Sequence, residues 1–279
     1  MKAAIVGIGL IGGSMALALK EKGLADKVIG VDQYEAHTKK ALELGLVDEV
    51  MALEDAIDAV DLVVLAVPVS AIADLAPAVL DCVQNQVVMD VGSTKLAMIE
   101  AIANHPKRCR FVASHPMWGT EYSGPEAAVR GAFEQKATVI CNRKDSDADA
   151  VALVENLYRA LGMHLVYMDA AAHDVHVAYI SHISHITSFA LANTVLEKER
   201  EEDAIFELAS AGFESTVRLA KSNPDTWASI FMQNRENVLD VLNEHISQLR
   251  KFKACLEKEN YPYLAELMNN ANRIKKILK

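Results

Sequence analysis

Short apolar runs alternate with segments of helical periodicity over residues 1–169 of the chain. An apolar run of strand length that ends at a glycine, a proline or a polar residue predicts a β-strand. The run 62–67 contains no polar position, which is typical of a central parallel strand buried on both faces. The predicted strands are residues 3–6, 28–31, 47–51, 62–67, 87–91, 111–114, 138–141 and 164–167. Helical patterns between most of them predict an α/β fold with a doubly wound, mostly parallel sheet.

The pattern changes after Asp169, because no run of strand type follows it. The remaining periodic segments are helical, at residues 171–198, 202–220, 225–258 and 262–278. Pro224 and Pro262 stand where two of these helices are expected to begin. We therefore expect two domains, a sheet domain at residues 1–169 and an all-helical domain at residues 170–279.

The first predicted strand runs into a glycine turn and then into a helix, and this turn indicates a nucleotide site. Gly7 allows a tight turn, Gly9 allows the backbone to approach a pyrophosphate, and Gly12 allows the helix and strand to pack closely. The second strand stops at Asp32, whose carboxylate suits ribose hydroxyls and repels a 2′-phosphate. The pattern predicts a Rossmann-type domain that binds NAD rather than NADP.

Other candidate residues of the site follow from the topology, because ligands bind at the carboxyl ends of strands in such sheets. That rule brings Val67, Pro68, the segment 93–95 and His115 beside the glycine turn, which includes Leu10 and Ile11 as further cofactor-binding candidates. His115 follows a strand directly, and neutral imidazole is suited to accept a hydroxyl proton near pH 7. Ser93 is expected to hydrogen-bond this ring, while a structural loop histidine is the alternative reading.

The helix expected from Ala171 carries four histidines, His173, His176, His182 and His185. An α-helical projection gathers Asp174, Ser181, His182 and His185 on one face and leaves Val177, Ile180, Ile183 and Thr187 away from it. Buried, hydrogen-bonded histidines explain such a helix as well as a ligand site does. His182 and His185 have no carboxylate in the same turn and nothing else has ligand spacing, so no metal site is predicted.

The net charge of -10 argues against a nucleic-acid partner, because no basic stripe is present to offset phosphate repulsion. The four cysteines lie far apart without CxxC spacing, which predicts neither a disulfide framework nor a zinc site and fits a reducing cytoplasm. No apolar run approaches the roughly 18 residues that a membrane span needs. We expect a cytoplasmic protein that is bound to no membrane.

The motifs of the chain, taken in order, resemble those of the prephenate dehydrogenase family of tyrosine biosynthesis. The resemblance covers nearly the whole chain. Its motifs are Gly7-x-Gly-Leu10-x-Gly-Gly-Ser14, Val67-Pro68-Val69, Gly92-Ser93-x-Lys95, His115-Pro116-Met117-x-Gly119-Thr120-Glu121-x-Ser123-Gly124, Ser181-His182-x-x-His185 and Gly212-Phe213-x-x-x-x-Arg218-x-Ala220.

The resemblance implies that NAD oxidatively decarboxylates prephenate to 4-hydroxyphenylpyruvate, CO2 and NADH. It implies that His115 is catalytic and hydrogen-bonds the C4 hydroxyl, and that Ser93 orients it. Residues in the positions that line the substrate site are Thr120, Glu121, His185 and Arg218. Arg218 resembles the arginine that binds a substrate carboxylate, and Lys95 is a second candidate cation for that carboxylate.

Three alternatives remain open. The segment 214–217 differs from many relatives, which leaves the choice between prephenate and its amino analogue arogenate undecided. A 3-hydroxyacid-type dehydrogenase shares the two-domain plan but places a catalytic lysine on an early helix of its second domain, where this chain has no lysine before Lys198. An NAD-binding sensor without turnover has no need for His115, Ser93 and Arg218 together.

The helical half also predicts the oligomeric state. It carries apolar pairs at 230–231, 238–239 and 241–242, together with Ile246, that one layer of helices cannot cover. Such faces predict a homodimer formed through this half of the chain. The family resemblance implies the same assembly, with Trp227 near the partner's active site.

Overall fold

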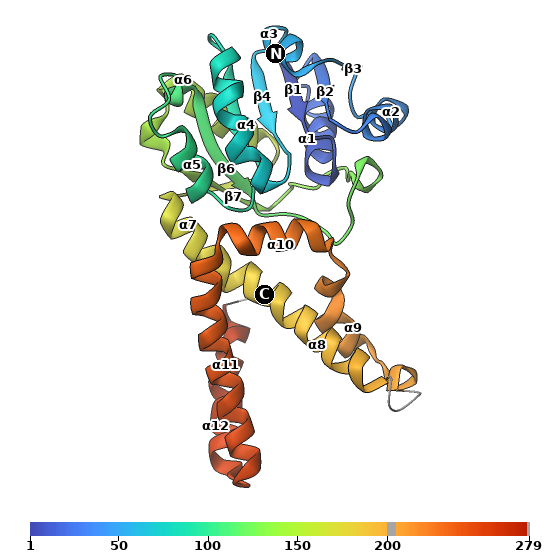
Figure 1. Ribbon diagram of the computed structural model, residues 1–279, viewed down its shortest axis with the longest axis vertical. Helices are drawn as coiled ribbons and strands as arrows, with labels where there is room; N and C mark the ends of the chain where they lie inside the picture. The colour runs from blue at the N-terminus through green and yellow to red at the C-terminus, as the bar shows by residue number, and fades with distance from the viewer. Residues whose placement is uncertain (200–204, 278–279) are drawn as a thin grey trace. The chain divides into compact units, whose positions relative to one another are not determined.

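The structure is a computed structural model that describes residues 1–199 and 205–277 (Figure 1). It contains two compact units, Met1–Asn234 and Arg235–Lys279. None of the helices in the described part of the chain combines the length and the apolar content that a membrane crossing needs.

The first unit is built on an eight-stranded sheet with the order β3-β2-β1-β4-β5-β6-β7-β8. All neighbouring strands are parallel except β6 and β7, which are antiparallel. The predicted doubly wound, mostly parallel sheet is therefore confirmed. The strands are β1 (Lys2–Val6), β2 (Lys27–Val31), β3 (Glu49–Val50), β4 (Leu62–Leu65), β5 (Val87–Asp90), β6 (Phe111–Pro116), β7 (Ala137–Cys141) and β8 (His164–Met168).

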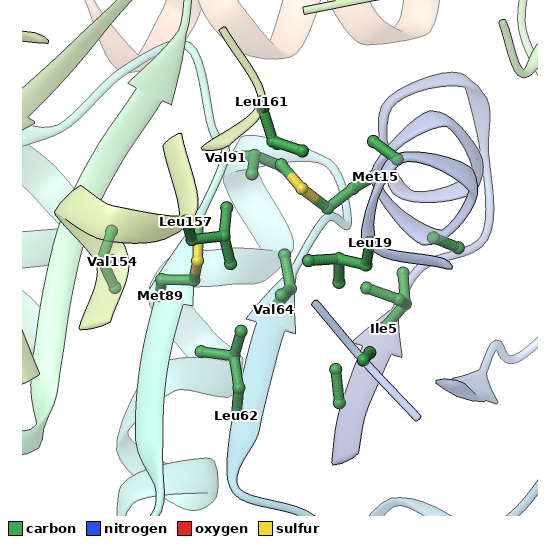
Figure 2. Packing of buried hydrophobic residues seen from close by; sticks show 14 of the residues in the cluster. Ile5, Met15, Leu19, Leu62, Val64, Met89, Val91, Val154, Leu157 and Leu161 are labelled. Atoms are coloured by element: carbon green, nitrogen blue, oxygen red, sulfur yellow. The ribbon is translucent and has the colours of Figure 1, made fainter. Parts of the chain in front are cut away.

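Successive side chains of the central strands point to opposite faces of the sheet, as the pleat requires. Ile5, Leu62 and Val64 pack in one apolar cluster with helices α1 and α6, as Figure 2 shows. Their neighbours in sequence, such as Val63, pack in a second cluster with α3, α4 and α5. All four residues of β4 are fully buried, which confirms the prediction made from the unbroken apolar run.

Helices follow the strands and then continue alone to the end of the chain. The α-helices are α1 (Leu10–Glu21), α2 (Glu35–Glu43), α3 (Leu53–Asp58), α4 (Val69–Cys82), α5 (Leu96–Ile102), α6 (Ala148–Ala160), α7 (Ala170–Val177), α8 (Ile183–Glu199), α9 (Ala211–Val217), α10 (Pro224–Gln233), α11 (Arg235–Glu257) and α12 (Tyr261–Ala271). Short 3-10 turns are η1 (Arg108–Arg110), η2 (Pro125–Ala127), η3 (Arg143–Asp145), η5 (Ile205–Leu208), η6 (Arg218–Lys221) and η7 (Asn272–Lys276). The segment η4 (Ala178–His182) is a π-helical turn.

Three of the four helices predicted after Asp169 are interrupted. The helix predicted at 171–198 contains the π turn η4, which separates α7 from α8. The start of the helix predicted at 202–220 lies outside the described residues, and the rest is η5, α9 and η6. The helix predicted at 225–258 is broken at Asn234, whose backbone (φ −104°, ψ 30°) leaves helical geometry between α10 and α11. Helical periodicity did not reveal these breaks, because it continues on both sides of them.

Helix α10 packs against α4, and its last residue fastens it to the carboxyl edge of the sheet (Figure 1). The Gln233 side-chain amide donates to the Val69 carbonyl (2.9 Å), and its oxygen accepts the Thr94 hydroxyl (2.6 Å). Two turns that follow strands β4 and β5 are thereby tied to a helix that comes more than a hundred residues later.

The second unit consists of α11, α12 and η7. Pro262 stands in the first turn of α12, and the Asn260 side chain accepts a hydrogen bond from the Tyr263 N–H at that end. Both features are typical helix starts, since proline lacks the N–H that would be unpaired and asparagine supplies an acceptor for one that is present.

Candidate active site

The glycine turn between β1 and α1 has the backbone geometry that its sequence predicts. Gly7 adopts φ +93°, and a Cβ atom there would lie 2.7 Å from the Ala66 carbonyl oxygen. A Cβ atom at Gly12 would meet the Gly7 carbonyl oxygen. Gly9 instead faces open space, since a Cβ atom there would meet nothing within 4 Å. Leu10 and Ile11 follow as the first residues of α1, so free N–H groups of the helix start border this open space.

Asp32 is held at the carboxyl end of β2, next to the same turn. Its carboxylate accepts hydrogen bonds from the backbone N–H groups of Ile8 and Tyr34, both at 2.9 Å, and lies 3.3 Å from His37 Nδ1. These contacts fix its orientation and leave acceptor capacity on the carboxylate. The Val67 nitrogen lies beside Gly7, and Pro68 follows it as the N-cap of α4, so the structure brings predicted cofactor residues of two strand ends together.

His115 lies in β6 and is almost fully buried, with 8% of its surface exposed. Its ring Nδ1 lies 2.9 Å from Nε2 of His173, in helix α7. The expected hydrogen bond from Ser93 is not formed among the described residues, and the ring contacts His173 through Nδ1 instead. Ser93 is half-buried in the turn between β5 and α5, and its proposed orienting role on His115 is corrected to that extent.

The His173 ring continues to a carboxylate. Its Nδ1 lies 2.7 Å from Oδ1 of Asp174, which also accepts the Lys95 backbone N–H at 2.8 Å. The other oxygen of Asp174 accepts the Leu96 N–H at 2.9 Å, so the carboxylate caps the start of helix α5. The three side chains of Asp174, His173 and His115 therefore form one continuous buried chain.

Lys95 is not available to a substrate carboxylate, which corrects the sequence-based expectation. Its side chain is fully buried, and its ammonium pairs with the carboxylate of Asp90, which is also fully buried. Asp90 accepts the backbone N–H groups of Gly92 and Ser114 as well. A buried carboxylate requires such partners. Among the described residues, Lys95 is the one positively charged group that pairs with Asp90.

Glu121 and Arg218 meet across 97 residues of sequence, with Arg218 Nη1 3.1 Å from Oε2 of Glu121. The Arg218 side chain is 51% exposed. Thr120 precedes Glu121 on an exposed loop and accepts the Tyr122 N–H at 3.3 Å. These residues form the accessible rim of the candidate site.

His185 lies in α8 between the buried residues and this rim. Its Nδ1 lies 3.0 Å from the Ser181 carbonyl, and its ring stacks on Trp227 of the same chain, with 3.3 Å between ring centroids. Trp227 thus covers His185 of its own chain, and its place near the partner's active site, which the resemblance implies, stays a prediction. The structure thus joins His185, Glu121 and Arg218 near one another but leaves Lys95 out.

Burial shapes the protonation of the histidines. Burial, followed by the neighbouring His173, Lys95 and His182, lowers the pKa of His115 well below its ordinary value. Burial lowers the pKa of His173 against the opposing effect of Asp174, and it lowers the pKa of His182 to about 4. The His185 pKa is also lowered, by burial and by the Arg218 charge, although the Ser181 carbonyl opposes the shift. All four rings are therefore neutral at pH 7.

On the rim, the surroundings favour the charged form of Glu121 instead. A hydrogen bond from its own backbone N–H lowers the pKa of Glu121, and the Arg218 charge lowers it further. The rim thus carries a charged pair at pH 7, whereas the histidines behind it carry no charge.

Several residues of the site were not found by sequence reasoning. Neither His173 nor Asp174 was connected to His115, although both stand on the helix predicted at 171–198. Asp90 had a recognisable signal, since an acidic residue inside the apolar run 87–91 must be paired when the strand is buried. No local signal marks Asn234, whose amide donates to the Asp174 backbone carbonyl (2.7 Å) over 60 residues of sequence.

Comparison with known proteins gives matches along almost the entire chain. Residues 15–167 match the family described as prephenate dehydrogenase, nucleotide-binding domain, and residues 169–270 match prephenate dehydrogenase, dimerization domain. The prephenate dehydrogenase of Bacillus subtilis (strain 168) is 30% identical over 262 residues, which cover 92% of this chain and 70% of that protein.

Two solved structures have the same fold over the full chain. The prephenate dehydrogenase from A. aeolicus in complex with hydroxyphenyl propionate and NAD+ superposes with a TM-score of 0.91 at 29% identity, covering 100% of this chain and 98% of that chain. The arogenate dehydrogenase of Synechocystis superposes with a TM-score of 0.79 at 26% identity, covering 100% of both chains.

Proposed function

The chain belongs to the prephenate dehydrogenase family, and on that premise we propose that it catalyses the NAD-dependent oxidative decarboxylation of prephenate to 4-hydroxyphenylpyruvate, CO2 and NADH. Its place in this family means that the chain is a dehydrogenase with a nucleotide-binding domain. The proposal adds the particular substrate and cofactor. The observation that carries it is the buried, neutral ring of His115 at the sheet edge that also holds the glycine turn.

The reaction needs one group that accepts a proton and later returns it. As hydride leaves C4 of prephenate, its hydroxyl proton must be taken up, and a neutral imidazole in a buried position accepts it without prior deprotonation. Loss of CO2 from C1 returns electrons to the ring and makes it aromatic, after which the proton can return to the phenolic oxygen. NAD, when bound, supplies the hydride acceptor, and His115 supplies the reversible proton store.

The substrate carries two carboxylates, and Arg218 is the proposed anchor for one of them. It donates one hydrogen bond to Glu121 and retains further guanidinium donors for a bidentate contact. Thr120 and His185 are proposed to line the same space, with Ser93 at the turn beside it. Lys95 is withdrawn from this role because of its pairing with Asp90.

NAD is the proposed cofactor because Gly9 leaves open space at the helix start and Asp32 is fixed where the adenosine ribose is expected. We predict a higher kcat/KM with NAD than with NADP. Asp32→Ala should weaken NAD binding and narrow that difference, since it removes the repulsion of a 2′-phosphate. Equal kcat/KM for both cofactors in the unmodified protein would contradict the assignment.

A homodimer formed through residues 170–279 remains part of the proposal, with a domain boundary near Asp169. Its support is the family described as a dimerization domain, which matches residues 169–270, and the apolar pairs of that half. Light scattering at micromolar concentration tests it, and a monomeric mass would exclude it.

The decisive experiment is an NADH absorbance assay with prephenate and with arogenate in parallel. Turnover of prephenate at the higher kcat/KM supports the proposal. Preference for arogenate would make the chain an arogenate dehydrogenase, as its Synechocystis neighbour is named. No turnover with either, in a protein that binds NAD, would favour a sensor without catalysis.

A further inference from the structure

The buried chain Asp174–His173–His115 goes beyond what a single proton acceptor needs. His173 and Asp174 are 0% and 3% exposed, so neither is placed to contact a substrate directly. Each is nevertheless joined to the next by a short contact, 2.7 Å from Asp174 to His173 and 2.9 Å from His173 to His115. Buried polar groups of this kind are costly unless they are fully paired. Here each ring donates its proton toward Asp174.

Asp174 determines which atom donates in each hydrogen bond of the chain. Both of its oxygens accept backbone N–H groups, from Lys95 and Leu96, at the start of helix α5. An ionised carboxylate accepts hydrogen bonds and donates none, so the proton between Asp174 and His173 must sit on His173 Nδ1. A neutral His173 then has a bare Nε2, which can only accept. The proton between the two rings must therefore sit on His115 Nδ1.

We propose that His173 and Asp174 are positioning residues that hold His115 in its Nδ1–H tautomer, so that Nε2 is the nitrogen that takes the substrate proton. The inference rests on the proposed function for the identity of that proton and on the hydrogen-bond chain for the tautomer. Among the described residues, His115 Nε2 has no hydrogen-bond partner, and it does not belong to the fully enclosed atoms that lack one. It is the free acceptor of the ring.

The surroundings favour neutral rings before the reaction and tolerate a charged one during it. The charged groups that face His115 and His173 are Lys95 and Asp90 from the sheet edge and Asp174 from α7, and His182 of η4 faces them as a neutral ring. When His115 accepts a proton at Nε2, its Nδ1–H still donates to His173. The imidazolium then holds the substrate's hydroxyl proton on Nε2, and its positive charge lies beside a ring whose far end contacts the Asp174 carboxylate.

The first test needs no substrate. Long-range 15N–1H NMR of the 15N-histidine-labelled protein distinguishes the two neutral tautomers of each ring, and His115→Asn identifies the His115 signals among the nine histidines. The expected result is Nδ1–H with a bare Nε2. An Nε2–H tautomer at His115 in the unmodified protein would overturn the proposal whatever the enzyme's activity.

The second test uses two variants at His173. His173→Leu removes the acceptor, so His115 should lose its single tautomer and kcat should fall by about 10- to 100-fold with KM nearly unchanged. His173→Gln offers an amide oxygen near the place of Nε2 and should recover part of the kcat and of the Nδ1–H signal. The matched control is His105→Leu, because His105 also lies beside a carboxylate, 3.2 Å from Asp81, but outside the site.

The outcomes separate this proposal from the proposed function. Unchanged kcat and an unchanged tautomer in His173→Leu would refute the positioning role while leaving the enzyme a dehydrogenase. A correct tautomer in a protein that turns over neither prephenate nor arogenate would refute the function and leave the hydrogen-bond chain intact. If His173→Leu does not fold, the NMR of the unmodified protein and the His173→Gln variant still decide the question.

Discussion

The two halves of the candidate site are built in opposite ways. The half around His115 is buried and neutral, and hydrogen bonds join it across β6, α7 and the start of α5. The half around Arg218 is half-exposed and charged, and it is joined to the site by the ion pair with Glu121. The first is fixed by folding alone, whereas the second has donors that water and a substrate can reach.

This difference predicts how each half responds to change. A group whose position is fixed before substrate arrives contributes to the transition state, so its loss should lower kcat. An exposed anchor that binds substrate and transition state alike contributes mainly to KM. Mutations in the two halves should therefore separate along kcat and KM.

The largest effect is expected at the buried half. His115→Asn removes the proton acceptor and should lower kcat by about 100-fold or more, with little change in NAD affinity. Steady-state kinetics and NAD titration measure the two quantities. Retention of most of the activity would assign the acceptor role to His185. It would also contradict the prediction that the buried half determines kcat.

The next effect is expected at the rim. Arg218→Ala should raise KM for prephenate by about 10- to 100-fold, or roughly 1.4–2.8 kcal/mol, with a smaller change in kcat. Arg218→Lys should reverse only part of this rise in KM, since an ammonium lacks the planar fork of a guanidinium. Arg159→Ala is a matched control, because Arg159 is 52% exposed and also pairs with a carboxylate, that of Glu155. Prephenate kinetics within about twofold in both Arg218 variants would identify Arg218 as a surface residue.

The last effect concerns stability rather than catalysis, and it belongs to the buried half. His182 has a pKa of about 4 in the folded protein and about 6.5 when unfolded, so above pH 6.5 it is neutral in both states. As pH falls below 6.5, the unfolded chain takes up a proton that the folded chain refuses, and stability decreases until about pH 4. At pH 5 this amounts to about 2 kcal/mol from His182.

Urea unfolding at pH 7.5 and at pH 5 measures this loss. His182→Gln should lose less stability between the two pH values than the unmodified protein, whatever its stability at pH 7.5. Arg159→Ala is the control and should show the unmodified loss, because Arg159 pairs with Glu155 outside the site. An equal loss in His182→Gln would show that another buried histidine accounts for the acid sensitivity.

The sheet and the glycine turn could be predicted because their signals are local. An unbroken apolar run identifies β4, and glycine spacing identifies a turn in which Gly7 must adopt a positive φ. The strand-end rule then brought His115 to the same edge as this turn. These inferences need only the chain and the geometry of parallel sheets.

The partners of His115 were missed for a structural reason. In an unbroken α-helix His173 and His182, nine residues apart, point about 180° away from each other. The π turn η4 holds one more residue per hydrogen-bonded turn, and with it both rings are buried. No pattern of apolar and polar residues marks that extra residue. The same holds for Asn234 and Lys95, whose partners are set by contacts between distant segments.

The two hydrogen bonds of Gln233 also bear on the order in which the protein assembles. They close loops of 139 and 164 residues, from Thr94 and Val69, so the turns after β4 and β5 gain them only after almost the entire first unit has been synthesised. Contacts between such distant residues form slowly, since the entropy of closing the loop is lost before the contact is gained. The sheet can therefore form early in synthesis on the ribosome, while its ligand-binding edge acquires its final shape among the last events of folding.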